Sequence, residues 1–290
     1  MITWGEKTYV MGILNLTPDS FSGDSILLHN DPVQFAMEKA KEFVAEGAHI
    51  LDLGAESSRP GSVPISAKDE LQRLIPVIQA IKKEKIPALL SIDTYKAEVA
   101  EACLAMGADW INDIWALQND PRIASVVAQY DIPVVLMHNR SAFGAVETDQ
   151  RLGSSYEADK YNDFLNDMIH DLQAIADNAI RAGVRAENII LDPGIGFGKT
   201  VTQNLQLINY LDRIKAIGYP ILIGPSRKSF IGKILDLPVE ERLEGTAAAI
   251  ALGIMRGADV IRVHDVRSMA RVAAMTDALL RASGQEDRPR

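Results

Sequence analysis

The sequence predicts a single (β/α)₈ barrel, an α/β fold formed by nearly the whole chain. Eight short apolar runs alternate with longer amphipathic stretches, and no change of composition divides the 290 residues into two parts. The runs are continuously apolar, as expected for strands that are buried on both faces. Eight strand–helix pairs are the number that a closed (β/α)₈ barrel needs, whereas a doubly wound open sheet does not require that number, so the barrel is favoured. We expect the barrel domain to span residues 1–282 and the tail 283–290 to be disordered.

Each predicted strand is a short apolar run with a polar residue at or near its end. In chain order the runs cover residues 9–14, 49–53, 88–92, 110–113, 132–137, 188–192, 219–223 and 259–263. In such a barrel the carboxyl ends of all strands meet at one mouth, where active sites are built. The polar residues that end the runs are therefore the first candidates for function.

The stretches between the runs carry helix signals. Asp31 followed by Pro32 fits an N-cap and the first helical position, and Gly47 fits the end of the same helix. Apolar residues at three- and four-residue spacing predict a second helix over 158–183. The alanine-rich stretch 244–257 predicts a helix with a small-residue face that packs closely on a sheet.

The composition excludes several classes of partner and location. The net charge is −9 and the isoelectric point about 5.1, so we expect neither a nucleic-acid nor a membrane partner. Cys103 is the only cysteine, so an internal disulfide is impossible and a reducing compartment is expected. No run reaches transmembrane length, and the first residues do not resemble a signal peptide. These observations predict a cytoplasmic protein.

The stretch IILDPGIGFGKT, residues 189–200, looks like a phosphate-binding loop but matches no nucleotide-binding pattern. The P-loop needs a glycine where Pro193 stands, and the dinucleotide fingerprint needs its third glycine where Lys199 stands. Each pattern fails by one residue. Asp192, directly after the apolar run, is the more informative residue of this stretch.

Nearly every predicted strand brings one or two hydrogen-bonding side chains to the mouth. Any single one is explained as a helix cap or turn residue, and for Asp113 and Asp265 a structural role explains the residue as well as chemistry does. For His138 the better explanation is a packing histidine with satisfied hydrogen bonds. Chance accounts less well for the whole set, which is Asn15, Asp52, Asp93, Asn112, Asp113, His138, Asp192, Ser226, Arg227, Lys228, Arg262, His264 and Asp265.

Asp93, Asn112 and Asp192 follow three different strands, and all three accept hydrogen bonds. Together they suit the edge of a flat heterocycle with several N–H groups, such as an aminopyrimidinone. The Arg262 guanidinium can stack on such a ring, and the Lys228 ammonium can reach a ring carbonyl or nitrogen. A Schiff base on Lys228 is the alternative, but its position beside another cation at a helix start favours binding of an anion or heteroatom.

A second group of residues suits a phosphate or diphosphate, because it combines hydroxyls, two arginines and an imidazole. Its members are Asn15, Ser57, Ser58, Arg59, Arg262 and His264. The Asn15 oxygen also suits Mg²⁺ that is otherwise held by water and phosphate oxygens. The alternative for SSRPG is a plain proline–glycine turn. Phe21, the apolar residue in the middle of TPDSFSGDS, is a candidate lid contact.

These motifs occur together in one enzyme family. Between Met11 and Val266 the chain carries, in this order, MGILNLTPDSFSGDS, DLGAESSRPGS, SIDT, IND, LDPGIGFGKT, GPSRKSFIG and RVHDV. In that order they closely resemble the dihydropteroate synthases, and NLTPDSFS, SRKSF and RVHDV are the motifs most specific to that family. DPGIGFGK alone is shared more loosely with other pterin-binding barrels.

The resemblance implies an alkyl- or aryl-transferring transferase of folate biosynthesis that is a target of sulfonamides. Such an enzyme joins 6-hydroxymethyl-7,8-dihydropterin diphosphate to 4-aminobenzoate and releases 7,8-dihydropteroate and diphosphate, with Mg²⁺ as cofactor. The resemblance also favours a homodimer, as does the small-residue face of TAAAIALGI.

Residue by residue, the resemblance implies three binding groups and one catalytic set. The pterin group is Asp93, Asn112, Asp192, Lys228 and Arg262. The diphosphate group is Asn15, Ser58, Arg59, Arg262 and His264, with Asn15 also on the metal. The 4-aminobenzoate group is Phe21, Pro60 and Ser229. The catalytic set is Asp93, Asp192, Lys228, Arg262 and His264.

Two rival functions remain open at this point, beside a generic phosphate-binding aldolase barrel in which Lys228 would form the Schiff base. A methyltetrahydrofolate-dependent methyltransferase barrel shares the Asp–Asn–Asp arrangement but needs no diphosphate site. A catalytically silent paralogue would bind pterin or diphosphate without turnover, although the intact diphosphate group argues against it. The chain also departs from the family pattern, with Ala55 where glycine is common and Ser58 where threonine is common. These departures concern the conformation of the loops.

Overall fold

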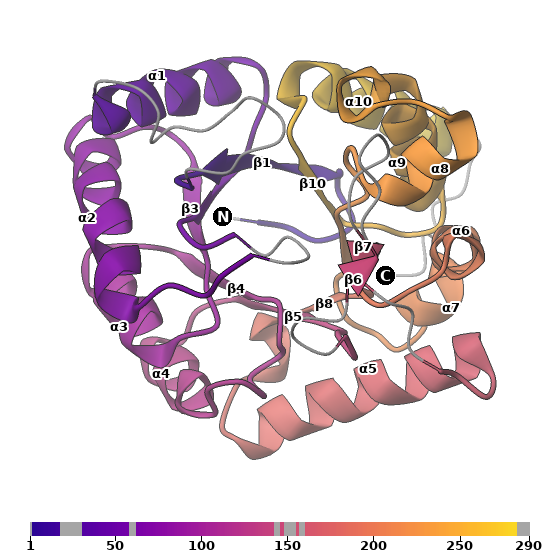
Figure 1. Ribbon diagram of the computed structural model, residues 1–290, viewed down its shortest axis with the longest axis horizontal. Helices are drawn as coiled ribbons and strands as arrows, with labels where there is room; N and C mark the ends of the chain where they lie inside the picture. The colour runs from indigo at the N-terminus through magenta and orange to yellow at the C-terminus, as the bar shows by residue number, and fades with distance from the viewer. Residues whose placement is uncertain are drawn as a thin grey trace.

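The computed structural model describes residues 2–17, 31–57, 62–141, 146–147, 155–156 and 160–282. Eight parallel strands form one sheet, and helices surround it on the outside (Figure 1). The strands are β1 (Tyr9–Asn15), β2 (Ile50–Gly54), β3 (Leu89–Asp93), β4 (Trp110–Asp113), β5 (Val134–Met137), β8 (Ile189–Asp192), β9 (Leu222–Ile223) and β10 (Val260–Val263). Each of them lies within or overlaps a predicted apolar run.

The sheet closes into a barrel. Its strand order is β8-β5-β4-β3-β2-β1-β10-β9, and all neighbours within it run parallel. A parallel bridge between Leu191 and Ile221 joins the two ends of this order, and the Leu191 N–H donates to the Pro220 carbonyl over 2.9 Å. The prediction of a (β/α)₈ barrel is confirmed, and the open sheet is excluded.

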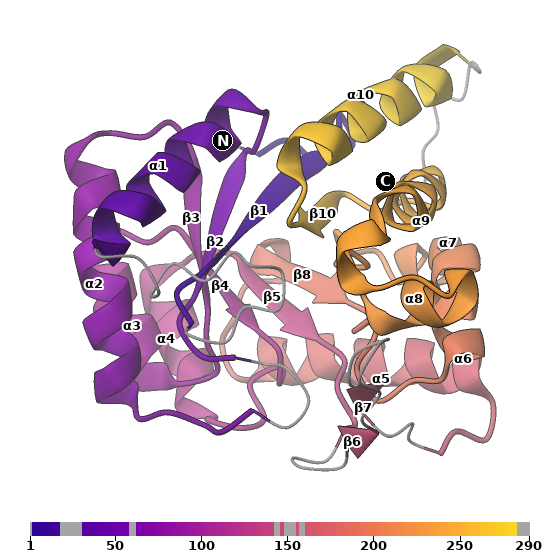
Figure 2. The same cartoon turned by 45° about the horizontal axis from the view of Figure 1, so that its top comes forward.

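The helices form a ring around the strands, as the tilted view shows (Figure 2). They are α1 (Pro32–Ala45), α2 (Ala67–Lys83), α3 (Ala97–Ala105), α4 (Arg122–Tyr130), α5 (Phe164–Arg181), α6 (Val201–Asn209), α7 (Leu211–Lys215), α8 (Ser229–Leu235), α9 (Leu243–Met255) and α10 (Val266–Ala282). The Asp31 side chain caps α1 by accepting from the Gln34 N–H over 2.9 Å, as predicted. Among the described helices, none combines the length and hydropathy that a membrane crossing needs.

Two details differ from the expectations. The helix predicted over 158–183 begins at Phe164, because Asp163 accepts from the Asn166 N–H and so acts as the N-cap. The loop after β5 contains a short antiparallel pair, β6 (Val146–Glu147) and β7 (Ser155–Tyr156), which the sequence did not predict. The predicted disorder of the tail 283–290 concerns residues outside the described ranges.

The barrel interior is divided into an apolar floor and a polar mouth. The floor is a buried cluster toward the amino ends of the strands, formed by Tyr9, Met11, Ile50, Trp110, Val135, Ile190, Leu222 and Val260. Trp4 packs against it, with ring centroids 5.9 Å from Tyr9 and 6.2 Å from Trp110. Side chains two positions apart on a strand share a face. The next inward position along four of these strands is polar, and these residues are Asp52, Asn112, Asp192 and Arg262.

Candidate active site

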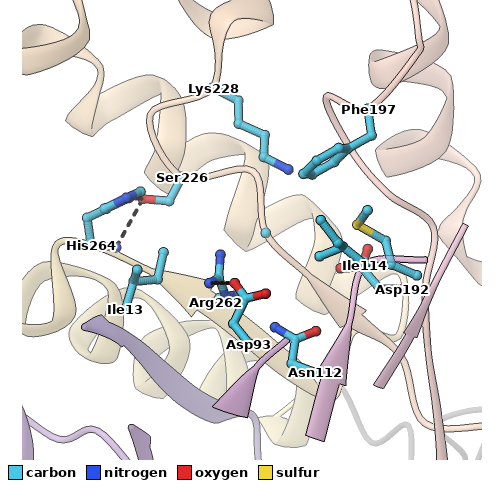
Figure 3. Close-up of a pocket in the computed structure, with 12 residues that line it drawn as sticks. Ile13, Asp93, Asn112, Ile114, Asp192, Phe197, Ser226, Lys228, Arg262 and His264 are labelled. Atoms are coloured by element: carbon cyan, nitrogen blue, oxygen red, sulfur yellow. Dashed lines mark hydrogen bonds and ion pairs between the residues drawn. The ribbon is translucent and has the colours of Figure 1, made fainter. Parts of the chain in front are cut away.

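One pocket at the mouth of the barrel collects half of the predicted binding residues (Figure 3). Its polar lining includes Asp93, Asn112, Asp192, Ser226, Lys228, Arg262 and His264. Its apolar lining is Ile13, Ile114, Met137 and Phe197, with Gly224 between β9 and α8. The complete predicted pterin group therefore faces a single cavity, although its members come from five segments of the chain.

Two carboxylates hold the Arg262 guanidinium. Its Nε donates to Asp52 Oδ2 and its Nη2 donates to Asp93 Oδ2, both over 2.6 Å. Burial raises the pKa of Asp93 to about 7, although the attraction of Arg262 works in the opposite direction. The guanidinium is thereby fixed in position and orientation within the pocket lining.

Asp52 is a buried partner of two predicted site residues, and the sequence assigned it no specific role. It is completely buried, and its Oδ2 also accepts from Asn112 Nδ2 over 3.1 Å. This contact fixes the side-chain amide of Asn112, whose oxygen is left to accept hydrogen bonds. The available signal was a lone carboxylate in an otherwise apolar strand, at an inward position between Ile50 and Gly54.

Asp192 and Lys228 are two further charged side chains of the pocket lining. Asp192 Oδ1 accepts from the Gly194 N–H over 2.7 Å. Burial raises the pKa of Asp192, while the nearby Lys228 ammonium lowers it. Burial lowers the pKa of Lys228 to about 8, against the attraction of Asp192. The Lys228 ammonium donates to the Ile195 carbonyl and lies 4.6 Å from the centre of the Phe197 ring.

Phe197 lines the pocket, and the sequence did not single it out. The loop between β8 and α6 carries it, and this loop turns through three glycines with positive φ: Gly194 (+69°), Gly196 (+84°) and Gly198 (+58°). A Cβ on Gly194 would lie 2.1 Å from the His138 carbonyl oxygen. A Cβ on Gly196 would lie 2.6 Å from Lys228 Cδ. The glycines therefore permit a close turn that presents the aromatic ring to the pocket.

This loop does not cradle a phosphate through Lys199. The Lys199 ammonium is buried and donates to the carbonyls of Gly194 and Phe197, over 3.0 and 2.9 Å. Its position is thus inside the loop, behind the pocket. The lysine of the GKT sequence has a different use from the lysine of a P-loop.

The structural explanations hold for the three ambiguous residues at the mouth. Asp113 accepts from the N–H groups of Trp115 and Leu117, over 2.8 and 2.7 Å, and so shapes the turn after β4. Asp265 pairs with Arg227 through contacts of 2.9 and 2.5 Å. His138 is buried, and its Nε2 lies 2.9 Å from Asp171 Oδ2. Burial lowers the pKa of His138 to about 4, so the imidazole is neutral at neutral pH.

The predicted diphosphate and 4-aminobenzoate groups are only partly described. His264 lines the pocket, and its Nδ1 lies 3.0 Å from Ser226 Oγ. Asn15 ends β1 and Ser229 begins α8, at the same end of the barrel, but neither lines the pocket. The remaining predicted members lie outside the described residues: Phe21, Ser58, Arg59 and Pro60.

The described residues contain no group of three His, Cys, Asp or Glu side chains that would hold a metal ion. A divalent cation at this mouth would therefore depend on single protein oxygens together with oxygens of a substrate. The half-buried Asn15 amide fits that role, because hard cations such as Mg²⁺ prefer neutral and anionic oxygen ligands.

Known proteins resemble this chain over nearly its whole length. The family model of pterin-binding enzymes matches residues 11–264. The dihydropteroate synthase of Bacillus subtilis is 48% identical over 283 residues, covering 98% of this chain and 92% of the relative. A dihydropteroate synthase structure from Clostridium difficile, determined in the presence of pteroic acid, has a TM-score of 0.86 and 42% identity over 97% of this chain and 100% of that chain.

A Yersinia pestis dihydropteroate synthase, solved as a sulfonamide drug complex, has a TM-score of 0.85 and 34% identity over 96% of this chain and 98% of that chain. These likenesses extend over nearly the whole chain. The methyltransferase reading is thereby set aside. The chain belongs to the family of pterin-binding enzymes, and within it to the dihydropteroate synthases.

Proposed function

We propose that this dihydropteroate synthase joins 6-hydroxymethyl-7,8-dihydropterin diphosphate to 4-aminobenzoate by a dissociative, SN1-like reaction in which the diphosphate leaves first. The observation that carries the proposal is the pocket itself. Hydrogen-bonding groups from three strands face one cavity beside two half-buried cations, Lys228 and Arg262. Such a cavity suits a polar heterocycle that becomes positively charged during the reaction.

The pterin ring binds between the carboxylates. In this proposal Asp192 and Asn112 accept from ring N–H groups, and Asp93 completes the polar edge. The Arg262 guanidinium, held by Asp52 and Asp93, stacks on the ring face. Lys228 reaches a ring carbonyl or nitrogen from the opposite side of the pocket.

The leaving diphosphate binds at the rim, to the side chains of Asn15, Ser58, Arg59, Arg262 and His264. Mg²⁺, held by the Asn15 oxygen and the diphosphate, would neutralise negative charge on the leaving group. The cations of the protein act in the same direction, because charge that develops in the transition state is stabilised by groups already in place. The catalytic set is Asp93, Asp192, Lys228, Arg262 and His264.

The bond changes balance without a redox step. The carbon–oxygen bond to the exocyclic methylene breaks, and its electron pair leaves with the diphosphate. The pterin ring shares the resulting positive charge, which the carboxylates of Asp93 and Asp192 stabilise. The amine nitrogen of 4-aminobenzoate then bonds to the methylene carbon and loses one proton. Departure of the diphosphate before the attack suits this reaction, because an aromatic amine is a weak nucleophile and reacts more readily with the cationic methylene carbon.

The second substrate binds above the methylene carbon. Ser229, the first residue of α8, is one residue from Lys228 and so lies beside the pocket. We assign its hydroxyl and N–H to the carboxylate of 4-aminobenzoate, with Phe21 and Pro60 packing on the ring. Sulfonamides, which resemble this substrate, are expected to compete for the same position.

We also propose a cytoplasmic homodimer. The one cysteine, Cys103, is a buried free thiol, which is compatible with a reducing compartment. The small-residue helix α9 is not fully covered within the monomer, since Ala248 is exposed and Met255 is 60% exposed. Light scattering of the purified chain distinguishes a dimer from a monomer.

A turnover assay with both substrates, with and without Mg²⁺, tests the reaction. We expect dihydropteroate to form with magnesium, and sulfonamides to raise the KM for 4-aminobenzoate. Binding of the pterin diphosphate without turnover would instead identify a silent paralogue. Arg59→Ala should slow product formation yet spare the affinity for the bare pterin ring. Collapse of ring binding in that variant would show that the diphosphate assignment is wrong.

A further inference from the structure

Behind the pocket, ionisable side chains gather around the buried Lys199 and support the loop that follows β8. Lys199 is only 6% exposed, and its three N–H donors have three acceptors. These are the carbonyls of Gly194 and Phe197, at 3.0 and 2.9 Å, and His138 Nδ1, at 3.4 Å. Every hydrogen-bonding direction of this ammonium is therefore directed into the protein.

The contacts of His138 determine its tautomer. Because Nδ1 accepts from the Lys199 ammonium, the ring proton is on Nε2, which donates to Asp171 Oδ2 over 2.9 Å. Asp171 also accepts from Arg140 Nε over 2.8 Å. A neutral imidazole thus connects a carboxylate on α5 to the lysine of the loop, and it fixes where the lysine ammonium lies.

The two carbonyls that Lys199 binds belong to residues that act on the pocket. Gly194 accepts from Lys199 with its carbonyl and donates its N–H to Asp192 Oδ1 over 2.7 Å. Phe197 accepts from Lys199 with its carbonyl and presents its ring to Lys228. The backbone of Gly194 therefore links Lys199 to the Asp192 carboxylate, and the backbone of Phe197 links it to the aromatic ring in the pocket.

We propose that Lys199 is a positioning residue for pterin binding, which holds the Asp192 carboxylate and the Phe197 ring in place through the backbone of Gly194 and Phe197. His138 and Asp171 fix the ammonium from behind. The proposal rests on the proposed function to the extent that Asp192 binds the pterin. It differs from a purely structural role, which would lower stability and leave the affinity of the folded protein unchanged.

The chain offers a matched control at the opposite end of the barrel. Lys215 is also 6% exposed, and its ammonium donates to Asp259 Oδ2 over 2.6 Å. We compare Lys199→Met with Lys215→Met by titrating the full-length protein with 6-hydroxymethylpterin in a calorimeter. Both variants should melt at lower temperature than the wild type. Only Lys199→Met should weaken pterin binding, by about tenfold, the usual result of misplacing one charged hydrogen-bond partner.

Equal affinities in the two lysine variants, or an unchanged affinity in Lys199→Met, would overturn the proposal. If Lys199→Met does not fold, the milder pair Lys199→Gln and Lys215→Gln carries the same comparison, with a loss of about threefold expected only in the first.

A double-mutant cycle tests the route through Gly194. The double variant Lys199→Met/Asp192→Asn should lose clearly less pterin affinity than the product of the two separate losses, because both substitutions act on the same carboxylate. Effects that multiply would refute this route. The readout is binding rather than turnover, so a wild-type protein that binds pterin without product formation would contradict the proposed reaction and leave this test intact.

Discussion

The mouth and the floor of the barrel are built by the same strands, yet they obey opposite rules. In β4, Trp110 belongs to the floor and Asn112 lines the pocket, two residues further along the same face. In β10 the corresponding pair is Val260 and Arg262. The floor gains stability from apolar burial, whereas the mouth keeps charges away from water at a cost in stability. The comparison teaches that a shift of two positions separates the residues that hold this barrel together from those that give it function.

The largest expected effect comes from opening a cavity in the floor. Met11 is completely buried there, so Met11→Ala should lower the free energy of unfolding by about 2–5 kcal/mol. Urea denaturation measures this loss, and calorimetry should show an unchanged pterin affinity. Met275→Ala is the control, since Met275 is 60% exposed and its loss should change stability by less than about 0.5 kcal/mol. Weakened pterin binding in Met11→Ala would contradict the claim that the floor contributes to stability and not to binding.

The reverse pattern is expected for a buried carboxylate of the mouth. Asp192→Ala should weaken pterin binding by about 100-fold, because a ring N–H would lose a charged partner. Its stability should change little, since the variant also removes the cost of burying a charge. Asp259→Ala is the matched control at the other end of the barrel, where Asp259 pairs with Lys215. That variant should lose about 3 kcal/mol of stability and keep its affinity. An unchanged pterin affinity in Asp192→Ala would refute the placement of the substrate.

A smaller effect is expected in the pH dependence of stability, where a histidine of the mouth can be compared with one near the floor. The pKa of His138 in the folded mouth is about 4, below its ordinary value of 6.5, because of burial. The unfolded chain therefore takes up a proton on this ring as the pH falls below 6.5, and the folded chain does not. Stability should decrease by about 2 kcal/mol between pH 7 and pH 5 through this group.

His138→Gln should remove that part of the pH dependence, which urea midpoints at the two pH values measure. His49, whose ring contacts the floor residue Tyr9, also has a pKa lowered by burial, but it is only half-buried, so His49→Gln should remove less. The opposite ranking of the two variants would show that His138 is not the dominant buried histidine.

The sequence was sufficient to predict the barrel and the convergence of the predicted pterin group at its mouth, because both follow from local rules. An apolar run predicts a strand, and the end of each parallel strand lies at the mouth, so Asp93, Asn112 and Asp192 were placed together without long-range information. The helix cap at Asp31 was equally local.

The contacts between these residues could not be read in the same way. Asp52 binds Arg262 across 210 positions of the chain, and the two come within 2.6 Å because β2 and β10 lie on either side of β1. The direction of Lys199 was hidden as well, since it depends on three successive turns at glycines with positive φ. A sequence pattern gives the residues of such a loop but not the side on which each one lies.

Those glycines also bear on the durability of an inhibitor. A compound that packs against the backbone turn at Gly194 or Gly196 would contact positions where a side chain collides with the His138 carbonyl or with Lys228. Substitution at either glycine to evade the drug would disturb the enzyme's own binding site. Resistance through substitutions in the target should therefore arise more slowly against such a compound than against one that binds mainly to side chains that the enzyme can replace.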